Sequence, residues 1–224
     1  MAGHPHDGLA YELMAPQGEP RGGVVVLHGA GSRKENHRDF AARCAAAGLA
    51  AIVFDQRGHG ASAGALDGRA LDDVEAIASL LPAGVPVFLR GSSMGGFIAL
   101  AAAARTRAAG VVAICPAGRD QLLAGLRERR LDFRAHRAAL EPLIAAQDLD
   151  AAARALGPRL LLVHAEGDAS VPIAHSRRLH AAAPGSRLLV LPGGDHQSAQ
   201  HDPALQAEAV AFLVGLTPAN GIPR

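Results

Sequence analysis

The sequence predicts a three-layer α/β/α sandwich built around a mostly parallel sheet of about seven strands. The chain has 224 residues, of which 49% are apolar, so it can fold as one domain around its own core. Short runs rich in leucine and β-branched residues alternate with longer alanine-rich stretches along the whole chain. The short runs are continuously apolar, which is typical of strands covered by helices on both faces.

The strands are expected where the apolar runs are short and continuous. In chain order these are residues 9–15, 23–28, 49–54, 85–91, 110–115, 159–165 and 187–191. The alanine-rich stretches predict helices at 37–47, 71–81, 94–106, 174–183 and 203–214. The last helix follows Asp202, a good N-cap residue, and opens with Pro203, which is favoured in a first helical turn.

One stretch, residues 117–157, interrupts this alternation. Its leucines mark three short helices, and it contains no strand pattern. An insertion of this length between two strands of a sheet either packs on the domain or forms a lid over a site. We therefore expect a single domain over residues 1–224, with a small helical lid at about 117–157.

The charge balance argues against a nucleic-acid partner. Lys and Arg number 22 against 21 Asp and Glu, and aromatic residues make up 3% of the chain, with no Trp. The chain therefore lacks both the basic excess that neutralises phosphates and the rings on which bases stack. The first residues show no signal-peptide pattern, and no apolar run is long enough to span a membrane. We expect a cytoplasmic protein whose two cysteines, Cys44 and Cys115, are reduced.

A candidate nucleophile lies between the strand predicted at 85–91 and the helix predicted at 94–106. From Gly91 to Gly95 the sequence reads G-x-S-x-G around Ser93. In this pattern the serine lies on a sharp turn that lifts its hydroxyl clear of the sheet, and the glycines avoid collisions with neighbouring backbone. The helix that follows offers backbone N–H groups to a developing oxyanion. An ordinary strand-to-helix turn explains the five residues equally well, so the motif alone does not establish a nucleophile.

A base and an orienting carboxylate for Ser93 follow two later strands. Asp168 lies in the loop after the strand predicted at 159–165, and His196 lies in the loop after the strand predicted at 187–191. In a parallel sheet these loops and the serine turn meet at the carboxyl edge, where the sites of such folds form. The order Ser, Asp, His along the chain is the one found in α/β-hydrolases. We therefore predict Ser93, Asp168 and His196 as catalytic nucleophile, acid and base.

Two other carboxylates compete with Asp168 for the role of acid. Asp195 adjoins His196, so its side chain is expected to point elsewhere. Glu166 lies closer to the strand, where the loop has not yet turned. Asp168 is therefore preferred.

Beyond the serine turn, the sequence resembles the α/β-hydrolase superfamily over nearly its whole length. It has His-Gly-Ala-Gly at 28–31 and Asp-Gln-Arg-Gly-His-Gly-Ala-Ser at 55–62, each after a predicted strand. It looks most like the compact serine hydrolases related to dienelactone hydrolase and to the serine aminopeptidase-like esterases and lipases. Ser93 stands where dienelactone hydrolases carry a cysteine, and one N-terminal strand of the family is missing. The resemblance implies an oxyanion hole made by the backbone N–H groups of Ala30 and Met94.

The expected activity is hydrolysis of a small or medium carboxylic ester through an acyl-enzyme. Thioesterase, acyltransferase and peptidase chemistry remain open on the same three residues, as does a non-catalytic binding protein with a hydrolase fold. The net charge of +1 suits an uncharged small-molecule ester, and the sequence does not indicate an oligomeric state. The residues expected to line the substrate pocket are His28, Gly29, Pro116 and Val171.

No cofactor or metal site is predicted. Residues 58–63 fit the loose fingerprint G-x-G-x-x-A of dinucleotide-binding turns, but they do not directly follow a strand, and no clear ribose-binding acid follows at the expected distance. The 11 histidines include no His-Glu-x-x-His pattern. His4 and His6 lie close to the N-terminus, and the histidines expected to serve turns or caps are His59, His164 and His175.

Two groups of charged residues have structural interpretations. Asp55 and Arg57 are predicted to form an ion pair that holds their turn. The lid segment carries a cluster of arginines, which form either a solvated helix face or a site that attracts an anionic group of the substrate. The members of this cluster are Arg127, Arg129, Arg130, Arg134 and Arg137.

Overall fold

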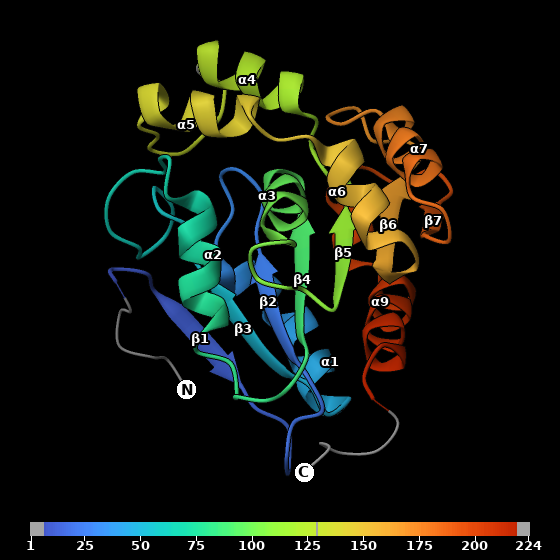
Figure 1. Ribbon diagram of the computed structural model, residues 1–224. Helices are drawn as coiled ribbons and strands as arrows, with labels where there is room; N and C mark the ends of the chain where they lie inside the picture. The colour runs from blue at the N-terminus through green and yellow to red at the C-terminus, as the bar shows by residue number, and fades with distance from the viewer. Residues whose placement is uncertain (1–6, 129, 219–224) are drawn as a thin grey trace.

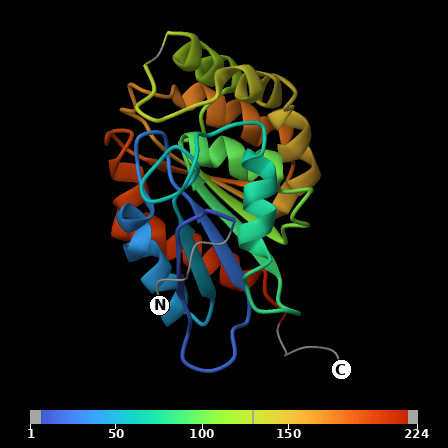
Figure 2. The ribbon, with the colours of Figure 1, turned by 90° about the vertical axis from the view of Figure 1, so that its left-hand side faces the viewer.

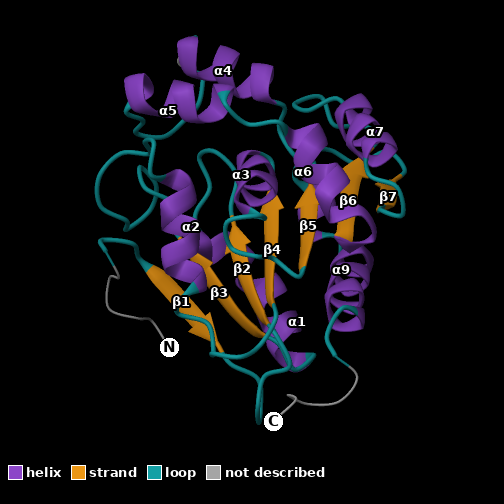
Figure 3. Cartoon of the chain, viewed as in Figure 1, coloured by secondary structure: helices purple, strands orange, loops and turns teal. Residues whose placement is uncertain are grey.

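The computed structural model describes residues 7–128 and 130–218. Its strands are β1 (Tyr11–Met14), β2 (Gly23–Leu27), β3 (Ala50–Phe54), β4 (Val87–Ser92), β5 (Gly110–Ile114), β6 (Leu160–Ala165) and β7 (Arg187–Leu191). They form one seven-stranded sheet in the order β1-β3-β2-β4-β5-β6-β7 (Figures 1 and 3). β1 pairs antiparallel with β3, and the remaining neighbours pair in parallel. The predicted, mostly parallel sheet is confirmed.

Helices cover both faces of this sheet, which gives the three layers seen in Figures 1 and 2. One face carries α2 (Ala70–Ala78), α3 (Met94–Ala102), α6 (Leu149–Leu156) and α7 (Ile173–Ala182). The opposite face carries α1 (Arg38–Ala46), α8 (Ser198–His201) and α9 (Pro203–Gly215). Among the described residues, no helix is both long enough and apolar enough to cross a membrane.

Alternate residues of each central strand point to opposite faces of the sheet and pack into two separate cores. In β2, Val25 and Leu27 belong to the cluster under α2 and α3, whereas Val24 and Val26 pack with Phe40 of α1. All five residues of β2 are buried, as are all five of β5. These strands therefore appear in the sequence as continuous apolar runs, because neither face meets water.

The seven predicted strands are confirmed, with ends that shift by at most two residues. The helix predicted at 37–47 is α1 (Arg38–Ala46), and a 3-10 turn, η1 (Lys34–His37), precedes it. Helix α8 escapes prediction because its four residues are too few to show helical periodicity. Asp202 caps α9 as predicted, because its carboxylate accepts hydrogen bonds from two N–H groups of the first turn at 2.9 Å each.

The insertion at 117–157 divides into two parts. Helices α4 (Arg119–Arg127) and α5 (Arg137–Ala145) pack on each other beyond the carboxyl edge of the sheet (Figure 1). Helix α6 instead packs against α3 and α7, as a helix of the sandwich does. Only α4, α5 and the loop between them lie where the predicted lid would be, and we call this segment the lid below. Its loop forms a β-bridge from Ala135 to Leu66 ahead of α2.

The predicted ion pair between Asp55 and Arg57 is wrong. The Asp55 carboxylate accepts hydrogen bonds from the backbone N–H and the Nζ of Lys34, both at 2.8 Å, and from the N–H of Ala61 at 2.9 Å. Arg57 extends the other way and pairs with Asp73 of α2 at 2.9 Å. The two residues are close in sequence, but the turn sends their side chains toward different partners.

Candidate active site

The serine turn lies at the carboxyl edge of the sheet. Ser93 stands between β4 and α3 with φ 54° and ψ −119°, a conformation that residues other than glycine rarely adopt. A side chain at Gly91 would collide with the carbonyl of Gly95, and a side chain at Gly95 would collide with the carbonyl of Leu27. The two glycines are therefore required by close backbone packing, as expected of a strained turn that exposes a serine hydroxyl.

Asp168 and His196 meet in the loops that follow β6 and β7. Asp168 Oδ2 accepts a hydrogen bond from His196 Nδ1 at 2.6 Å. The Asp168 side chain is fully buried, and its Oδ1 accepts from the N–H groups of Ser170 and Val171 at 2.8 Å each. Burial alone raises the pKa of this carboxyl, but the hydrogen bonds from His196 and Val171 outweigh burial and lower the pKa below its usual value. The pair is an ionised carboxylate that orients an imidazole.

The serine turn is bonded to the segment beside this pair. The N–H of Ser93 donates to the carbonyl of Ile114 at 2.9 Å. The next residue, Cys115, has its Sγ within 4.8 Å of a carboxylate oxygen of Asp168 and a ring nitrogen of His196. The structure thus brings the three residues predicted as nucleophile, acid and base to one part of the sheet edge.

Neither competing carboxylate bonds to His196. Asp195 accepts hydrogen bonds from the two N–H groups at the start of α8, at 2.9 and 2.8 Å. Glu166 is exposed and lies 3.7 Å from Arg177. The contacts of all three acids therefore agree with the preference for Asp168.

Two backbone amides beside Ser93 are available to a ligand. Met94 N–H is the first donor of α3, and first-turn amides have no partner within their own helix. Ala30 follows Gly29, which lies so close to Ser93 that a Cβ added to Gly29 would come within 3.2 Å of the Ser93 Cβ. Within residues 7–128 and 130–218, neither amide donates a hydrogen bond to another protein group.

His28 supports this turn from inside the protein, which corrects the prediction that it lines the pocket. Its ring is fully buried, Nε2 accepts the N–H of Gln56 at 3.0 Å, and Nδ1 donates to the carbonyl of Gly29 at 2.8 Å. Burial lowers the pKa of His28 to about 4, so the ring is neutral near pH 7. The ring is thus buried beneath the turn and is bonded to it through the carbonyl of Gly29.

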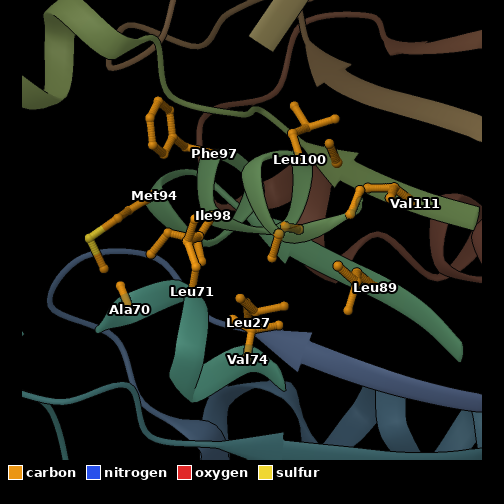
Figure 4. Packing of buried hydrophobic residues seen from close by; sticks show 14 of the residues in the cluster. Leu27, Ala70, Leu71, Val74, Leu89, Met94, Phe97, Ile98, Leu100 and Val111 are labelled. Carbon is orange, nitrogen blue, oxygen red and sulfur yellow. The ribbon is translucent and has the colours of Figure 1, made fainter. Parts of the chain in front are cut away.

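A small apolar cavity of about 10 Å³, the space of roughly one water molecule, lies between the lid and helices α2 and α3. Met94, the residue after Ser93, is part of its wall, and Figure 4 shows Met94 close to Ile98 and to Leu71 of α2. The full lining is Leu66, Ala70, Leu71, Met94, Phe97, Ile98, Leu122, Leu126, Leu131, Phe133, Leu140, Leu143, Ile144 and Gln147. The cavity therefore begins beside the serine turn and is walled almost entirely by carbon.

This lining does not include the four residues predicted for the pocket, which are His28, Gly29, Pro116 and Val171. Val171 is buried and serves the site through its N–H, which holds Asp168. Leucines that indicate the lid helices in the sequence do line the cavity. No sequence pattern indicates that residues of α2 line it as well. The sequence pattern of an apolar helix face is the same whether that face packs in a core or lines a cavity.

A polar groove lies on the other side of the lid loop. Leu131 and Phe133 border both the groove and the apolar cavity, and Arg134 of the predicted arginine cluster lines the groove. The other walls are Gly31, Ser32, Arg33, Asn36, Gly58, His59, Gly60 and Asp132. Three further arginines of the cluster pair with lid glutamates, namely Arg127, Arg130 and Arg137. Arg129 lies outside the described residues.

Two of the three histidines expected to serve turns or caps do so, and the third, His175, lies within α7 and is bonded to Arg178 at 3.2 Å. His164 is buried and bonds to the carbonyl of Val171 at 2.9 Å, and His59 bonds to the carbonyl of Arg57 at 3.1 Å. His175 is half-buried, and burial lowers its pKa to about 4. His4 and His6 lie outside the described residues.

In the part of the chain that the structure describes, one group of three side chains brings metal-ligating atoms within 4.8 Å of one another, namely Cys115, Asp168 and His196. The imidazole and carboxylate of this group already share a 2.6 Å hydrogen bond. The donor set therefore suits proton transfer between a base and its orienting acid better than it suits an ion.

Two family models match the chain. Residues 18–131 match the family described as serine aminopeptidase, S33, and residues 140–222 match the family described as TAP-like protein. Over 105 residues the chain is 35% identical to a monoacylglycerol lipase of Mycolicibacterium smegmatis, covering 43% of this chain and 38% of the lipase. Over 112 residues it is 34% identical to the monoglyceride lipase of Homo sapiens, covering 45% of this chain and 37% of that protein. The matched segments thus span less than half the length of these curated relatives.

Solved structures share the fold over almost the whole chain. A monoacylglycerol lipase of Paleococcus ferrophilus superposes with a TM-score of 0.73 at 20% identity, covering 93% of this chain and 99% of that one. The α/β hydrolase GrgF from Penicillium sp. sh18 gives a TM-score of 0.74 at 18% identity, covering 97% and 98%. The expected α/β-hydrolase fold is therefore confirmed.

Proposed function

Because the chain belongs to the serine aminopeptidase S33 family of α/β-hydrolases, we propose that it is a serine hydrolase that cleaves carboxylic esters through an acyl-enzyme. The observation that carries the proposal is the 2.6 Å hydrogen bond between His196 and the buried Asp168, beside the strained turn of Ser93. A serine on such a turn becomes a nucleophile when an imidazole removes its proton, and the imidazole does so when a carboxylate orients it.

In the proposed reaction, Ser93 Oγ attacks the ester carbonyl carbon while His196 accepts the hydroxyl proton. Asp168 stabilises the imidazolium that forms, and the N–H groups of Ala30 and Met94 donate to the oxyanion of the tetrahedral intermediate. Collapse of the intermediate breaks the bond to the alcohol, which leaves with the proton from His196. A water molecule, deprotonated by His196, then attacks the acyl-enzyme and releases the acid.

The apolar cavity and the polar groove lie on either side of the lid loop. We assign the cavity to the acyl part of the proposed substrate and the groove to its alcohol part. The apolar cavity begins at Met94 and offers almost no hydrogen-bonding groups, so an aliphatic acyl chain would enter it as α4 and α5 move away from α2 and α3 and enlarge it. The groove beyond Leu131 and Phe133 is lined by polar and charged side chains, so it suits a hydrophilic alcohol. Esters of a medium-length fatty acid with a polar alcohol fit this arrangement, and relatives named as monoacylglycerol lipases support the same substrate class.

A substrate panel tests this proposal. p-Nitrophenyl esters of increasing acyl length and monoacylglycerols of matching lengths are assayed with the native protein and with Ser93→Ala. We expect turnover of both ester classes with an optimum at medium acyl length, and a loss of several orders of magnitude in Ser93→Ala. Turnover restricted to acyl-coenzyme A or to aminoacyl amides would contradict esterase function and would favour a thioesterase or a peptidase on the same three residues.

A further inference from the structure

A second side chain besides that of His196 lies near the buried carboxylate of Asp168. Cys115 follows β5 directly, and its Sγ lies within 4.8 Å of both an Asp168 oxygen and a His196 ring nitrogen. We propose that the Cys115 thiol is a positioning group of the triad, which donates a hydrogen bond to Asp168 and so sets how strongly Asp168 holds the protonated form of His196. The inference rests on the proposed function and adds to it a residue outside the three that carry the chemistry.

The backbone holds Cys115 in a strained conformation at this place. Its φ is 43°, in the left-handed region that favours glycine, and its N–H donates to the carbonyl of Val163 in β6 at 2.8 Å. The side chain is 1% exposed. A non-glycine residue keeps such a conformation only where its surroundings fix it, and such residues gather at functional sites. A glycine would satisfy the backbone better, so the side chain itself is the feature that needs an explanation.

The hydrogen bonds to Asp168 leave room for one more donor. Oδ1 accepts from the N–H groups of Ser170 and Val171, and Oδ2 accepts from His196. His164 Nε2 is 3.5 Å from Oδ2, but its proton is directed to the carbonyl of Val171 at 2.9 Å. A fully buried carboxylate oxygen has capacity for two donors, so Oδ2 can accept from a thiol as well as from His196.

The thiol is in the protonated form that can donate. Burial raises the pKa of Cys115 to about 12, and the neighbouring charge of Asp168 adds to this rise, whereas a backbone contact at Ala165 and the charge of Arg90 oppose it. A thiol donor at this place would in turn help to lower the pKa of Asp168. Cys115 therefore acts as an S–H donor and not as a thiolate nucleophile.

The other titratable groups around this pair are few. His196 and Arg177 act electrostatically on His164, which lies against Asp168 from β6. Because His164 directs one ring nitrogen to a carbonyl and the other to the Ser176 hydroxyl at 2.7 Å, it has no proton to offer the carboxylate. Among the described residues that face Asp168, three groups besides His196 can therefore donate to its carboxylate, namely the two loop amides and the thiol. Loss of any of them would leave more negative charge on the carboxylate that His196 contacts.

Removal of the thiol changes the basicity of the pair in a defined direction. The S–H hydrogen carries partial positive charge, which offsets part of the carboxylate charge that the imidazole feels. Without this donor the protonated imidazole is favoured, so His196 stays protonated to a higher pH. The carboxylate also loses one of the contacts that fix its orientation, so the rate of the chemical step falls while substrate binding does not change.

Three variants test the inference. Cys115→Ala removes the donor, and Cys115→Ser restores one of similar size. Cys44→Ala is the matched control, because Cys44 is also free and fully buried, lies in α1 away from the triad, and has a thiol pKa raised to about 12 by burial. For each protein, kcat, KM and the pH profile of kcat/KM are measured on one ester, and the titration of the His196 ring is followed by NMR.

We expect Cys115→Ala to lower kcat by roughly five- to tenfold with KM unchanged, and to move the acid limb of the profile and the His196 titration to higher pH. Cys115→Ser is expected to return both toward the native curves, and Cys44→Ala to leave both in place. A Cys115→Ala profile that superimposes on the native one, a Cys115→Ser protein that behaves as Cys115→Ala, or an equal shift in Cys44→Ala would overturn the inference. The NMR titration does not depend on turnover, so an absence of esterase activity would count against the proposed function and leave the role of Cys115 to be decided by the His196 curve.

Discussion

A buried carboxylate such as Asp168 keeps its charge only because donors surround it. Its Oδ1 accepts two loop amides at 2.8 Å each, and its Oδ2 accepts His196 at 2.6 Å. These contacts lower the pKa of a group whose burial alone would raise it. At the scale of single residues, the proposed chemistry therefore depends on a short loop after β6 that carries both the acid and the amides that hold it.

Substitution of Asp168 is expected to lower the rate far more than substitution of Asp195. Asp168→Asn keeps the shape but offers His196 an amide, which favours the wrong tautomer, so kcat is expected to fall by about 10³- to 10⁴-fold with little change in KM. Asp195→Asn, next to His196 in sequence but bonded to the start of α8, is the control and is expected to stay within about tenfold of the native rate. Steady-state kinetics on one ester checks both, and similar losses in the two variants would contradict the assignment.

At the scale of elements, the proposed acyl side of the site depends on the lid. Helices α4 and α5 contribute leucines to a cavity whose opposite wall comes from α2 and α3. The same lid loop separates this cavity from the polar groove through Leu131 and Phe133. Under the proposed function, specificity for the two halves of the substrate would reside mainly in the insertion, and the sheet edge would supply the catalytic groups.

A bulky residue in the cavity is expected to shorten the accepted acyl chain. Leu143 of α5 lines the cavity and is only partly buried, so the larger side chain of Leu143→Trp blocks the region between the lid and helices α2 and α3 that an acyl chain would enter. We expect kcat/KM for a medium-chain ester to fall at least roughly tenfold, while the value for an acetate ester changes by less than about threefold. Ala138→Trp, on the exposed side of the same helix, is expected to leave the chain-length profile unchanged. A profile that is equally unchanged in Leu143→Trp would contradict the acyl assignment.

Over the whole molecule, the sequence predicts the fold well wherever neighbouring residues carry the signal. Strands buried on both faces, such as β2 and β5, are visible as continuous apolar runs, and the parallel sheet places the loops that carry Ser93, Asp168 and His196 at one edge. These features depend on local pattern and topology, which one sequence contains. Helix α8, with four residues, is too short to leave a pattern.

Features that depend on distant partners were not predictable. Asp55 pairs with Lys34, 21 residues earlier, rather than with Arg57, because the fold of η1 brings the Lys34 amide and ammonium to the same carboxylate. The cavity draws its walls from α2, α3 and the lid, so its lining is set by how three helices pack. His28 was expected in the pocket, yet it is buried and supports the turn from within.

Buried neutral histidines make the stability of the whole domain sensitive to acid. Burial lowers the pKa of His28 to about 4 and also lowers the pKa values of His37 and His164. In the unfolded chain histidines titrate near about pH 6.5. Below that pH the unfolded state therefore binds protons that the folded state does not bind. Stability is therefore fully present above about pH 6.5 and is lost as the pH falls toward 4.

Urea unfolding at pH 7 and pH 5 measures this loss. We expect His28 to contribute about 2 kcal/mol to the decrease in the free energy of unfolding between the two pH values. His28→Asn is expected to lower stability at pH 7 but to show a smaller decrease between pH 7 and pH 5 by about that amount. His136→Asn, at an exposed position, serves as the control and is expected to keep the native dependence. A native decrease in His28→Asn would show that this residue is not held neutral.

The central claim, that Ser93 is the nucleophile, is tested most directly by active-site labelling. The native protein is treated with a fluorophosphonate and digested, and the modified residue is identified by mass spectrometry. We expect the phosphonyl group on Ser93, complete loss of labelling in Ser93→Ala, and near-native labelling in Ser92→Ala, whose hydroxyl is buried in β4. A label on another residue, or labelling of Ser93→Ala at the native rate, would contradict the account.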